Sequence, residues 1–206
     1  MARPRIAPRQ QRSRETYDRI LDVAAKIFSE QGYAGTTTNK VAEVAGISIG
    51  TLYHYVPDKD ALLYALAERH LDTGTKAIFG TFKRLRRNNP DLRESLRILI
   101  EVVVYMHVEQ SNLHHLLYNG APQSPELGKR LHEADAAIAA EVAWHLERLD
   151  VANEHRALTA QLMVSGIEAQ AHSAIIDAKL HGETPAEPGV LIEVLTRLWT
   201  RALQDS

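Results

Sequence analysis

The sequence predicts an all-α fold of about nine helices, divided into a three-helix helix-turn-helix head and a larger helical domain. Three observations lead to this prediction. Apolar residues recur at helical spacing in long segments, turns containing glycine or proline separate these segments, and two short helices joined by a glycine turn lie near the N-terminus. The predicted divisions are a basic, flexible arm over residues 1–12, the head over 13–57 and the helical domain over 58–206.

Composition favours a globular protein outside the membrane. The chain has 206 residues, of which 45% are hydrophobic, enough to bury a core. It contains no cysteine, which excludes disulfides and thiolate chemistry. No apolar run approaches the length of a membrane span, and the basic N-terminus lacks the apolar core of a signal peptide. We therefore expect a cytoplasmic protein with no membrane partner.

Positive charge gathers at the N-terminus, although the whole chain carries a net charge of −2. Arginines occur repeatedly before residue 15, and no acidic residue lies among them. Such an arm either enters the minor groove of DNA beside a DNA-binding head or is a solvated, disordered tail. The sequence leaves both interpretations open.

The head begins with a helix predicted over Ser13–Gln31, which Gly32 ends. Its apolar stripe should pack against two shorter helices. The resulting core is small, so we expect it to pack against the helix that follows the head and to be stabilised by it. The predicted core residues are Leu21, Phe28, Val41, Val44, Ile47 and Leu52.

Two short helices with a tight turn between them follow. Thr37 or Thr38 can start the first, because a threonine hydroxyl accepts from unpaired backbone N–H groups, and Gly46 ends it. Ser48 can start the second helix, which Pro57 stops. Helix, glycine turn and helix form the helix-turn-helix pattern, in which the second helix enters the major groove of DNA.

The second of these helices also has suitable chemistry. Thr51, Tyr53, His54 and Tyr55 offer hydroxyl and imidazole groups that can bond phosphates or base edges, whereas Leu52 is the one strong apolar anchor. We expect the run Thr51–Tyr55 to be held outward.

The stretch Gly46–Leu62, GISIGTLYHYVPDKDAL, resembles the DNA-binding signature of the tetracycline-repressor (TetR) family. So do the preceding segments Ile20–Phe28 and Gly32–Thr38, and the resemblance covers about the first third of the chain. Two positions depart from the family pattern. Ile49 stands where a polar residue is frequent, and Val56 stands where phenylalanine is usual.

The resemblance implies a role for each matching position. Thr37 and Thr38 would meet phosphates, and Gly50 would allow close backbone approach. Thr51 and His54 would contact base edges. Tyr53, Tyr55 and Lys59 would fix the register on phosphates. The complete DNA-binding set is Thr37, Thr38, Ser48, Gly50, Thr51, Tyr53, His54, Tyr55 and Lys59.

Periodicity predicts six further helices after the head. Their approximate ranges are Lys59–Arg87, Leu92–Glu109, Ser111–Tyr118, Pro125–Leu149, Asn153–His181 and Pro188–Leu203. The first of these has a weak point at Asp72–Thr75, and Ser124 should cap the helix that begins at Pro125.

The helix over Leu92–Glu109 is apolar nearly all round, which predicts a central buried position. Its interruptions, Arg97, Glu101 and Tyr105, share one face. That face is either a solvent-facing stripe or the polar edge of a ligand cavity, and the sequence does not separate the two.

Leucine, isoleucine, valine, tyrosine and tryptophan dominate the last five predicted helices, which favours an apolar or aromatic small molecule as effector over a sugar phosphate. The candidate ligand-binding residues are His70, Glu101, Tyr105, His107, Leu117, Trp144, Met163 and Gln170.

The last two predicted helices carry more apolar surface than one subunit needs, which predicts a homodimer through them. In the TetR family these helices form a four-helix dimerisation bundle. The resemblance further implies a repressor that binds a palindromic double-stranded operator as a dimer. An effector bound in the helical domain would tilt the helix that begins at Lys59 and release the DNA.

The chain has 10 histidines, of which His107, His114 and His115 lie close in sequence. The Gln110–Asn112 stretch argues against one continuous helical face for them, and zinc-site spacing is missing. We therefore predict no metal site and no cofactor, and leave open that one histidine lines a ligand pocket.

Two alternative functions remain, an all-helical enzyme using histidine and glutamate as acid and base, and a ligand-binding scaffold with a DNA-binding head of secondary importance. No nucleophile elbow, phosphate loop, HExxH or paired-carboxylate motif is present, so we predict no enzymatic activity.

Overall fold

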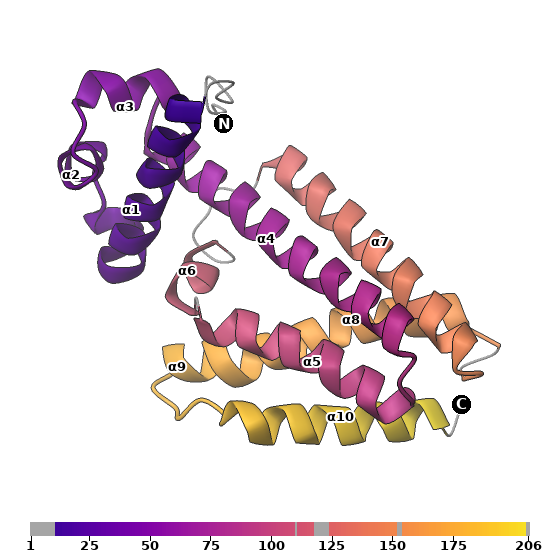
Figure 1. Cartoon of the computed structure of the whole chain (residues 1–206). Coiled ribbons are helices and arrows are strands. Elements are labelled where there is room, and N and C mark those ends of the chain that lie inside the picture. Colours follow the sequence, from indigo (N-terminus) through magenta and orange to yellow (C-terminus); the bar gives the residue numbers. More distant parts are fainter. Residues whose placement is uncertain (1–10, 110, 118–123, 152–153, 205–206) are drawn as a thin grey trace. The chain divides into compact units, whose positions relative to one another are not determined.

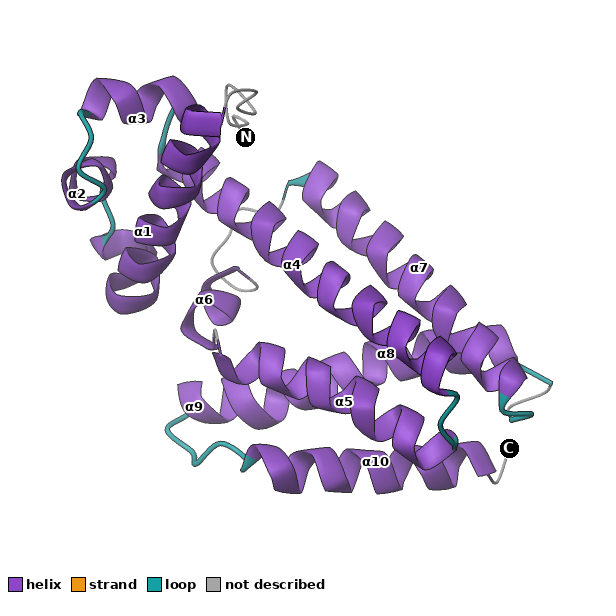
Figure 2. Ribbon diagram, in the orientation of Figure 1, coloured by secondary structure: helices purple, strands orange, loops and turns teal. Residues whose placement is uncertain are grey.

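The structure, a computed structural model, describes residues 11–109, 111–117, 124–151 and 154–204 (Figure 1). Within these ranges the elements are helices joined by turns, and no strand occurs, which confirms the all-α prediction (Figure 2). Residues 1–10 of the predicted arm lie outside the described residues, and Gln11 and Arg12 already belong to the first helix. Among the described helices, none has the length and apolar character that crossing a membrane requires.

The chain divides into two compact units. One contains residues 1–72 and 112–127, and the other contains residues 73–111 and 128–206. Helix α4 (Lys59–Asn88) contributes its first part to one unit and its second part to the other. The predicted weak point at Asp72–Thr75 does not interrupt this helix, but it coincides with the change of unit. The functional boundary at residue 57 stays a prediction.

The first unit contains α1 (Gln11–Gly35), α2 (Thr38–Val44), α3 (Ile49–Tyr55) and all but the first residue of the short α6 (Ser111–His115). Helix α1 breaks where the sequence predicts its end, because Gly32 has a φ of +66°, a conformation that glycine adopts without a Cβ clash. The next residues form one more helical turn, up to Gly35.

The core of the first unit differs from the predicted core at one residue. Val44 is 51% exposed, because Val41, Ala42 and Ala45 already fill the inward side of the two-turn helix α2. The first part of α4 contributes Leu62 and several neighbours, so the head does lean on the following helix as expected. Other buried members are Ile20, Leu21, Ala24, Ile27, Phe28, Leu52, Val56, Leu63, Leu66 and Leu113.

The second unit contains the later part of α4, most of α7 (Pro125–Arg148), and three further helical runs. These are α5 (Leu92–Glu109), α8 (Arg156–His172) and α10 (Pro188–Gln204). A π-helical turn (Ser173–Asp177) and the short α9 (Ala178–Leu180) continue α8, so one long helical run stands where the sequence predicts one. The predicted start of that run, Asn153, lies outside the described residues.

Helices α5 and α10 run side by side through the second unit (Figure 1). The sequence predicts a central buried position for α5 and leaves open whether its polar face meets solvent. One face, with Leu96, Ile100 and Val104, is buried, whereas Arg97 and Tyr105 lie on an exposed face. Helices α10 and α8 both pack against α5, but the side chains of Arg97 and Tyr105 stay in water.

A buried histidine occupies the core where α4 and α7 contribute side chains. The ring of His145 is 3% exposed and stacks on Phe82 with centroids 5.5 Å apart. Arg148 Nε donates to His145 Nδ1 over 3.4 Å, a contact that needs an unprotonated Nδ1. Burial, followed by the positive charges of Arg148 and Arg86, lowers the pKa of His145 to about 4.

Acidification is therefore expected to remove up to about 3 kcal/mol of stability through His145. The unfolded histidine takes up a proton near its ordinary pKa of 6.5, whereas the folded histidine stays neutral down to about 4. The unfolded state binds more protons in this window, so stability is complete above pH 6.5 and is lost as the pH falls. Urea unfolding at several pH values, compared between the wild type and His145→Gln, measures the effect. An identical pH dependence in the two proteins would contradict the assignment.

Candidate nucleic-acid interface

The start of α2 is capped as the sequence predicts. Thr37 has extended backbone angles, and its hydroxyl accepts from Lys40 N over 3.2 Å. The helix ends in Ala45 and Gly46, where Gly46 has a φ of +66°. Two backbone hydrogen bonds, from Gly46 N and from Ile47 N, close this turn on the carbonyls of Glu43 and Ala42. The turn therefore directs the chain into α3 without a side-chain clash.

Helix α3 is capped in the same manner. Ser48 Oγ accepts from Thr51 N over 3.0 Å and lies 2.8 Å from Thr51 Oγ1. At the other end, Val56 N donates to Leu52 O, and Asp58 Oδ1 accepts from Ala61 N over 2.7 Å to start α4. Short helices depend on such caps, because most of their backbone groups have no partner within the helix.

Most of the predicted DNA-binding residues of α3 face outward. Tyr53 and His54 are exposed, Thr51 is half-buried, and Leu52 is fully buried as the anchor. The structure corrects the expectation that Tyr55 faces outward. Its side chain is 6% exposed, and its ring centroid lies 5.9 Å from that of Tyr17. It lies one helical turn after Leu52 and therefore shares the inward face of α3.

The hydroxyl of Tyr55 is also engaged within the protein, 3.0 Å from Ser13 Oγ. The remaining predicted positions are accessible to differing degrees. Thr37, Ser48 and Gly50 are exposed, whereas Thr38 and Lys59 are half-buried.

One contact links the two helices of the motif on its outer surface. The hydroxyl of Tyr53 lies 3.2 Å from Thr38 Oγ1, so a side chain at the start of α2 meets one in the middle of α3. Each of these groups can donate and accept. Together they form a polar edge whose position is set by both helices, and hydroxyl groups are among those that can bond to phosphate.

Lys59 is held by the end of α1. Its Nζ donates to Tyr33 O over 2.8 Å and lies 4.0 Å from the centre of the Tyr33 ring. The Tyr33 hydroxyl donates in turn to Asp60, and this hydrogen bond is the first cause that raises the pKa of Tyr33 to about 12. Tyr33 and Asp60 were not among the residues predicted from sequence, because their contacts join the end of α1 to the start of α4.

The candidate ligand-binding residues are not brought together at one place within either unit. His70 and Leu117 belong to the first unit, where His70 Nε2 lies 3.1 Å from His114 Nδ1 and Leu117 packs against the core. In the second unit Met163 is buried in the core. Trp144 lies beneath the Arg86 guanidinium, whose central carbon is 3.6 Å from the ring centre.

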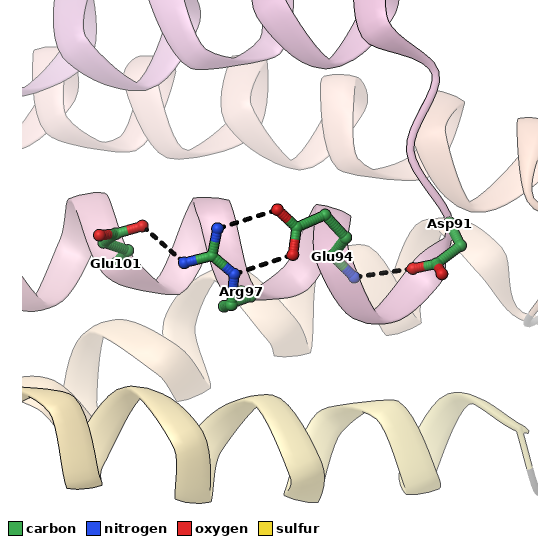
Figure 3. A network of polar contacts seen from close by, with 4 residues as sticks. All are labelled: Asp91, Glu94, Arg97 and Glu101. Atoms are coloured by element: carbon green, nitrogen blue, oxygen red, sulfur yellow. Dashed lines mark hydrogen bonds and ion pairs between the residues drawn. The ribbon is translucent and has the colours of Figure 1, made fainter.

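Glu101 and Tyr105 belong to the exposed face of α5. Arg97 is bound by two nitrogens to Glu94, at 2.8 and 2.9 Å, and by a third nitrogen to Glu101 at 3.0 Å (Figure 3). Asp91 accepts from Glu94 N over 2.9 Å and starts the helix (Figure 3). This face is therefore a solvated ion-pair stripe, and its interpretation as the polar edge of a cavity is wrong.

Gln170 and His107 each have a defined structural partner. Gln170 Oε1 accepts from Trp199 Nε1 over 3.1 Å, where α8 and α10 approach each other. His107 is fully buried and lies 3.2 Å from Glu168. Glu168 was not among the residues predicted from sequence, because it lies far from His107 along the chain; it stands four residues before His172 on α8.

Comparison with known proteins places the head in a recognised group. Residues 20–66 match the family described as bacterial regulatory proteins, tetR family. The chain is 30% identical over 108 residues to the HTH-type transcriptional repressor KstR2 of Rhodococcus jostii, a match over 48% of this chain and 51% of the relative. A regulator of Staphylococcus aureus, SAB2452, is 26% identical over 106 residues, 52% of this chain and 55% of the relative. The chain thus spans about half the length of the curated relatives it matches.

Solved structures extend the likeness to nearly the whole chain. A TetR-family regulator from Mesorhizobium loti has a TM-score of 0.72 at 18% identity and covers 94% of this chain and 98% of its own. The transcriptional regulator FadR of Bacillus subtilis, solved in complex with stearoyl-CoA, has a TM-score of 0.69 at 18% identity, and the match covers 89% of this chain and 97% of FadR. At these identities the likeness concerns the fold.

Proposed function

Because the chain belongs to the tetR family of bacterial regulatory proteins, we propose that it is a DNA-binding transcriptional repressor. It binds a palindromic operator as a homodimer and is released by a small apolar or aromatic ligand. The observation that carries this proposal is the capped α2–turn–α3 motif, whose outer surface presents Thr37, Thr38, Tyr53 and His54 to solvent. A helix-turn-helix with this surface places hydroxyl and imidazole groups against a duplex.

The direct test is a gel shift with the promoter of the protein's own gene or of the adjacent gene. We expect a salt-sensitive complex with a rough palindrome, and no comparable complex with a scrambled duplex of equal length. Equal affinity for both duplexes would refute sequence-specific repression. Screening the same preparation for hydrolase and transferase activity tests the enzyme alternative.

Exposed apolar side chains on α8 and α10 support dimerisation through these helices. Leu158 and Leu162 on α8, and Val190, Val194 and Leu198 on α10, are all exposed, although both helices also contribute to the core. A helix that is apolar on its inward and outward faces needs a second partner. A second copy of the chain is the partner that a palindromic operator requires.

The ligand class follows from the composition of the second unit. Its core is built from leucine, isoleucine, valine and aromatic side chains, so a bound effector would meet mainly apolar surface. The FadR structure with stearoyl-CoA makes a long-chain acyl thioester the first compound to test. Addition of such a compound to the operator complex is expected to release the DNA, and unchanged binding with acyl thioesters and aromatic compounds alike would refute ligand release of this class.

Lys59 offers a test of the electrostatic part of DNA binding. If its ammonium meets a phosphate, Lys59→Ala should reduce the slope of log affinity against log salt by about one per contacting lysine. Lys59→Arg keeps the charge and serves as the control. Because Lys59 also holds the end of α1 through Tyr33, a thermal melt must accompany the measurement. If a folded Lys59→Ala protein keeps the wild-type slope of log affinity against log salt, Lys59 does not contact a phosphate.

A further inference from the structure

Two histidines and a glutamate lie close together in the second unit, where α5 packs against α8. His107 is on α5, and Glu168 and His172 stand four residues apart on α8, so they share one face of that helix. His107 Nε2 lies 3.2 Å from Glu168 Oε1. The rings of His107 and His172 have centroids 5.9 Å apart, and a nitrogen of one ring lies within 4.8 Å of a nitrogen of the other. Imidazole and carboxylate are the ligand types that zinc, nickel and cobalt prefer.

The backbone decides which nitrogen of His107 is available as a ligand. His107 Nδ1 lies 2.8 Å from Val103 O, and because a carbonyl oxygen only accepts, Nδ1 carries the hydrogen. In the neutral ring Nε2 then carries the lone pair, and it faces the oxygen of Glu168. Two electron-pair donors at this distance repel each other unless a cation stands between them. Histidines that bind metals are commonly oriented by such a backbone carbonyl.

His172 has comparable support. Its Nε2 lies 3.5 Å from Asp177 Oδ1, and a carboxylate behind a histidine favours the tautomer whose other nitrogen can bind a metal. Asp177 ends the π-helical turn that begins directly after His172. Such turns within α-helices are frequent at functional sites.

We propose that His107, Glu168 and His172 bind one divalent transition-metal ion, with Zn²⁺ as the best fit. Two ligands at the usual distance from a tetrahedral zinc ion are about 3.3 Å apart, close to the separation of His107 Nε2 and Glu168 Oε1. His172 supplies the third ligand, since one of its ring nitrogens lies within 4.8 Å of a nitrogen of His107. Glu168 is 37% exposed, so an ion can enter from that side, while His107 is fully buried. Water fills the remaining position.

A proton on His107 Nε2 competes with a metal ion for the position between this nitrogen and the Glu168 carboxylate. Burial by itself lowers the pKa of His107, but the hydrogen bond and the negative charge of Glu168 outweigh burial and raise it above its ordinary value. The carboxylate that attracts a proton to this ring also attracts a metal ion. Direct titration with metal ions distinguishes a bound metal ion from a proton.

The experiment uses the full-length, untagged protein after removal of metals by a chelator. Titration with Zn²⁺ in a calorimeter gives the stoichiometry, and titration with Co²⁺ gives the ligand-field spectrum of the site. We expect one ion per chain in the wild type. Glu168→Gln and His172→Gln should each weaken Zn²⁺ binding about tenfold or more, and each should change the Co²⁺ spectrum.

The matched control is His155→Gln, which removes an exposed histidine at the start of the same helix. It should bind Zn²⁺ as the wild type does, and circular dichroism should show equal helix content in all variants. Absence of stoichiometric binding by the wild type would overturn the proposal. So would wild-type affinity in both folded variants, Glu168→Gln and His172→Gln. Neither result depends on DNA, so the metal site and operator binding are tested separately.

Discussion

Leu162→Glu combined with Leu198→Glu is expected to convert the proposed dimer into a monomer and to weaken operator binding about 10²–10⁴-fold. These side chains are 55% and 49% exposed on α8 and α10, the helices proposed to form the interface. A carboxylate introduced into an apolar interface loses its hydration without gaining a partner. A monomer then holds a single half-site and loses the effective concentration that the second head provides. Light scattering after gel filtration measures the mass, and fluorescence anisotropy with labelled operator measures the affinity.

The control for this pair is Leu131→Glu, which places the same charge on α7 at an exposed leucine outside the proposed interface. It should remain dimeric and bind the operator with wild-type affinity. If the double variant stays dimeric, or if a true monomer binds as tightly as the wild type, the proposed assembly is wrong.

Tyr53→Phe is expected to weaken operator binding by about 10²–10⁴-fold in the dimer. The change removes one hydroxyl from the outer edge formed with Thr38 and leaves the ring in place. A hydrogen bond to a charged phosphate contributes about 1.5–3 kcal/mol, or about 10–100-fold, and each substitution is present in both half-sites. Affinity is measured by anisotropy at fixed salt, because phosphate contacts are salt-dependent.

Tyr55→Phe is the matched control, since it is the same substitution two residues further along α3. The Tyr55 hydroxyl is directed to Ser13 rather than to solvent, so operator affinity should change by no more than about twofold. The sequence predicts that both tyrosines contact DNA, whereas the structure leaves only Tyr53 exposed, so the two variants distinguish these predictions. Equal losses of operator affinity in the two variants would show that Tyr55 also contacts the DNA. An unchanged affinity in Tyr53→Phe would show that the Tyr53 hydroxyl does not.

Much of the head could be predicted from sequence because its elements depend on local interactions. Thr37 and Ser48 in the head, like Ser124 before α7, were expected to start helices, and each accepts a hydrogen bond from a backbone N–H three residues later. A cap involves only neighbouring residues, so composition and spacing are sufficient to recognise it. The burial of Tyr55 was predictable on the same grounds, because helical periodicity places it beside Leu52.

The candidate ligand residues could not be predicted in this way. Glu101 was assigned to a cavity from its place in an apolar helix, yet its carboxylate pairs with Arg97 on an exposed face. The helix pattern shows which residues share a face, but it does not show which neighbouring helix covers that face. That information depends on contacts between segments far apart in the chain.

The sequence by itself determined the helical segments, their caps and the glycine turn of the helix-turn-helix motif, because all of these rest on interactions within a few residues. Only the tertiary structure decided which faces are covered and which side chains meet. It turned Tyr55 inward, left the outer leucines of α8 and α10 uncovered, and brought His107 to Glu168 and His172. The physical reason is that packing between helices is a property of the whole chain, and no local pattern specifies its partners.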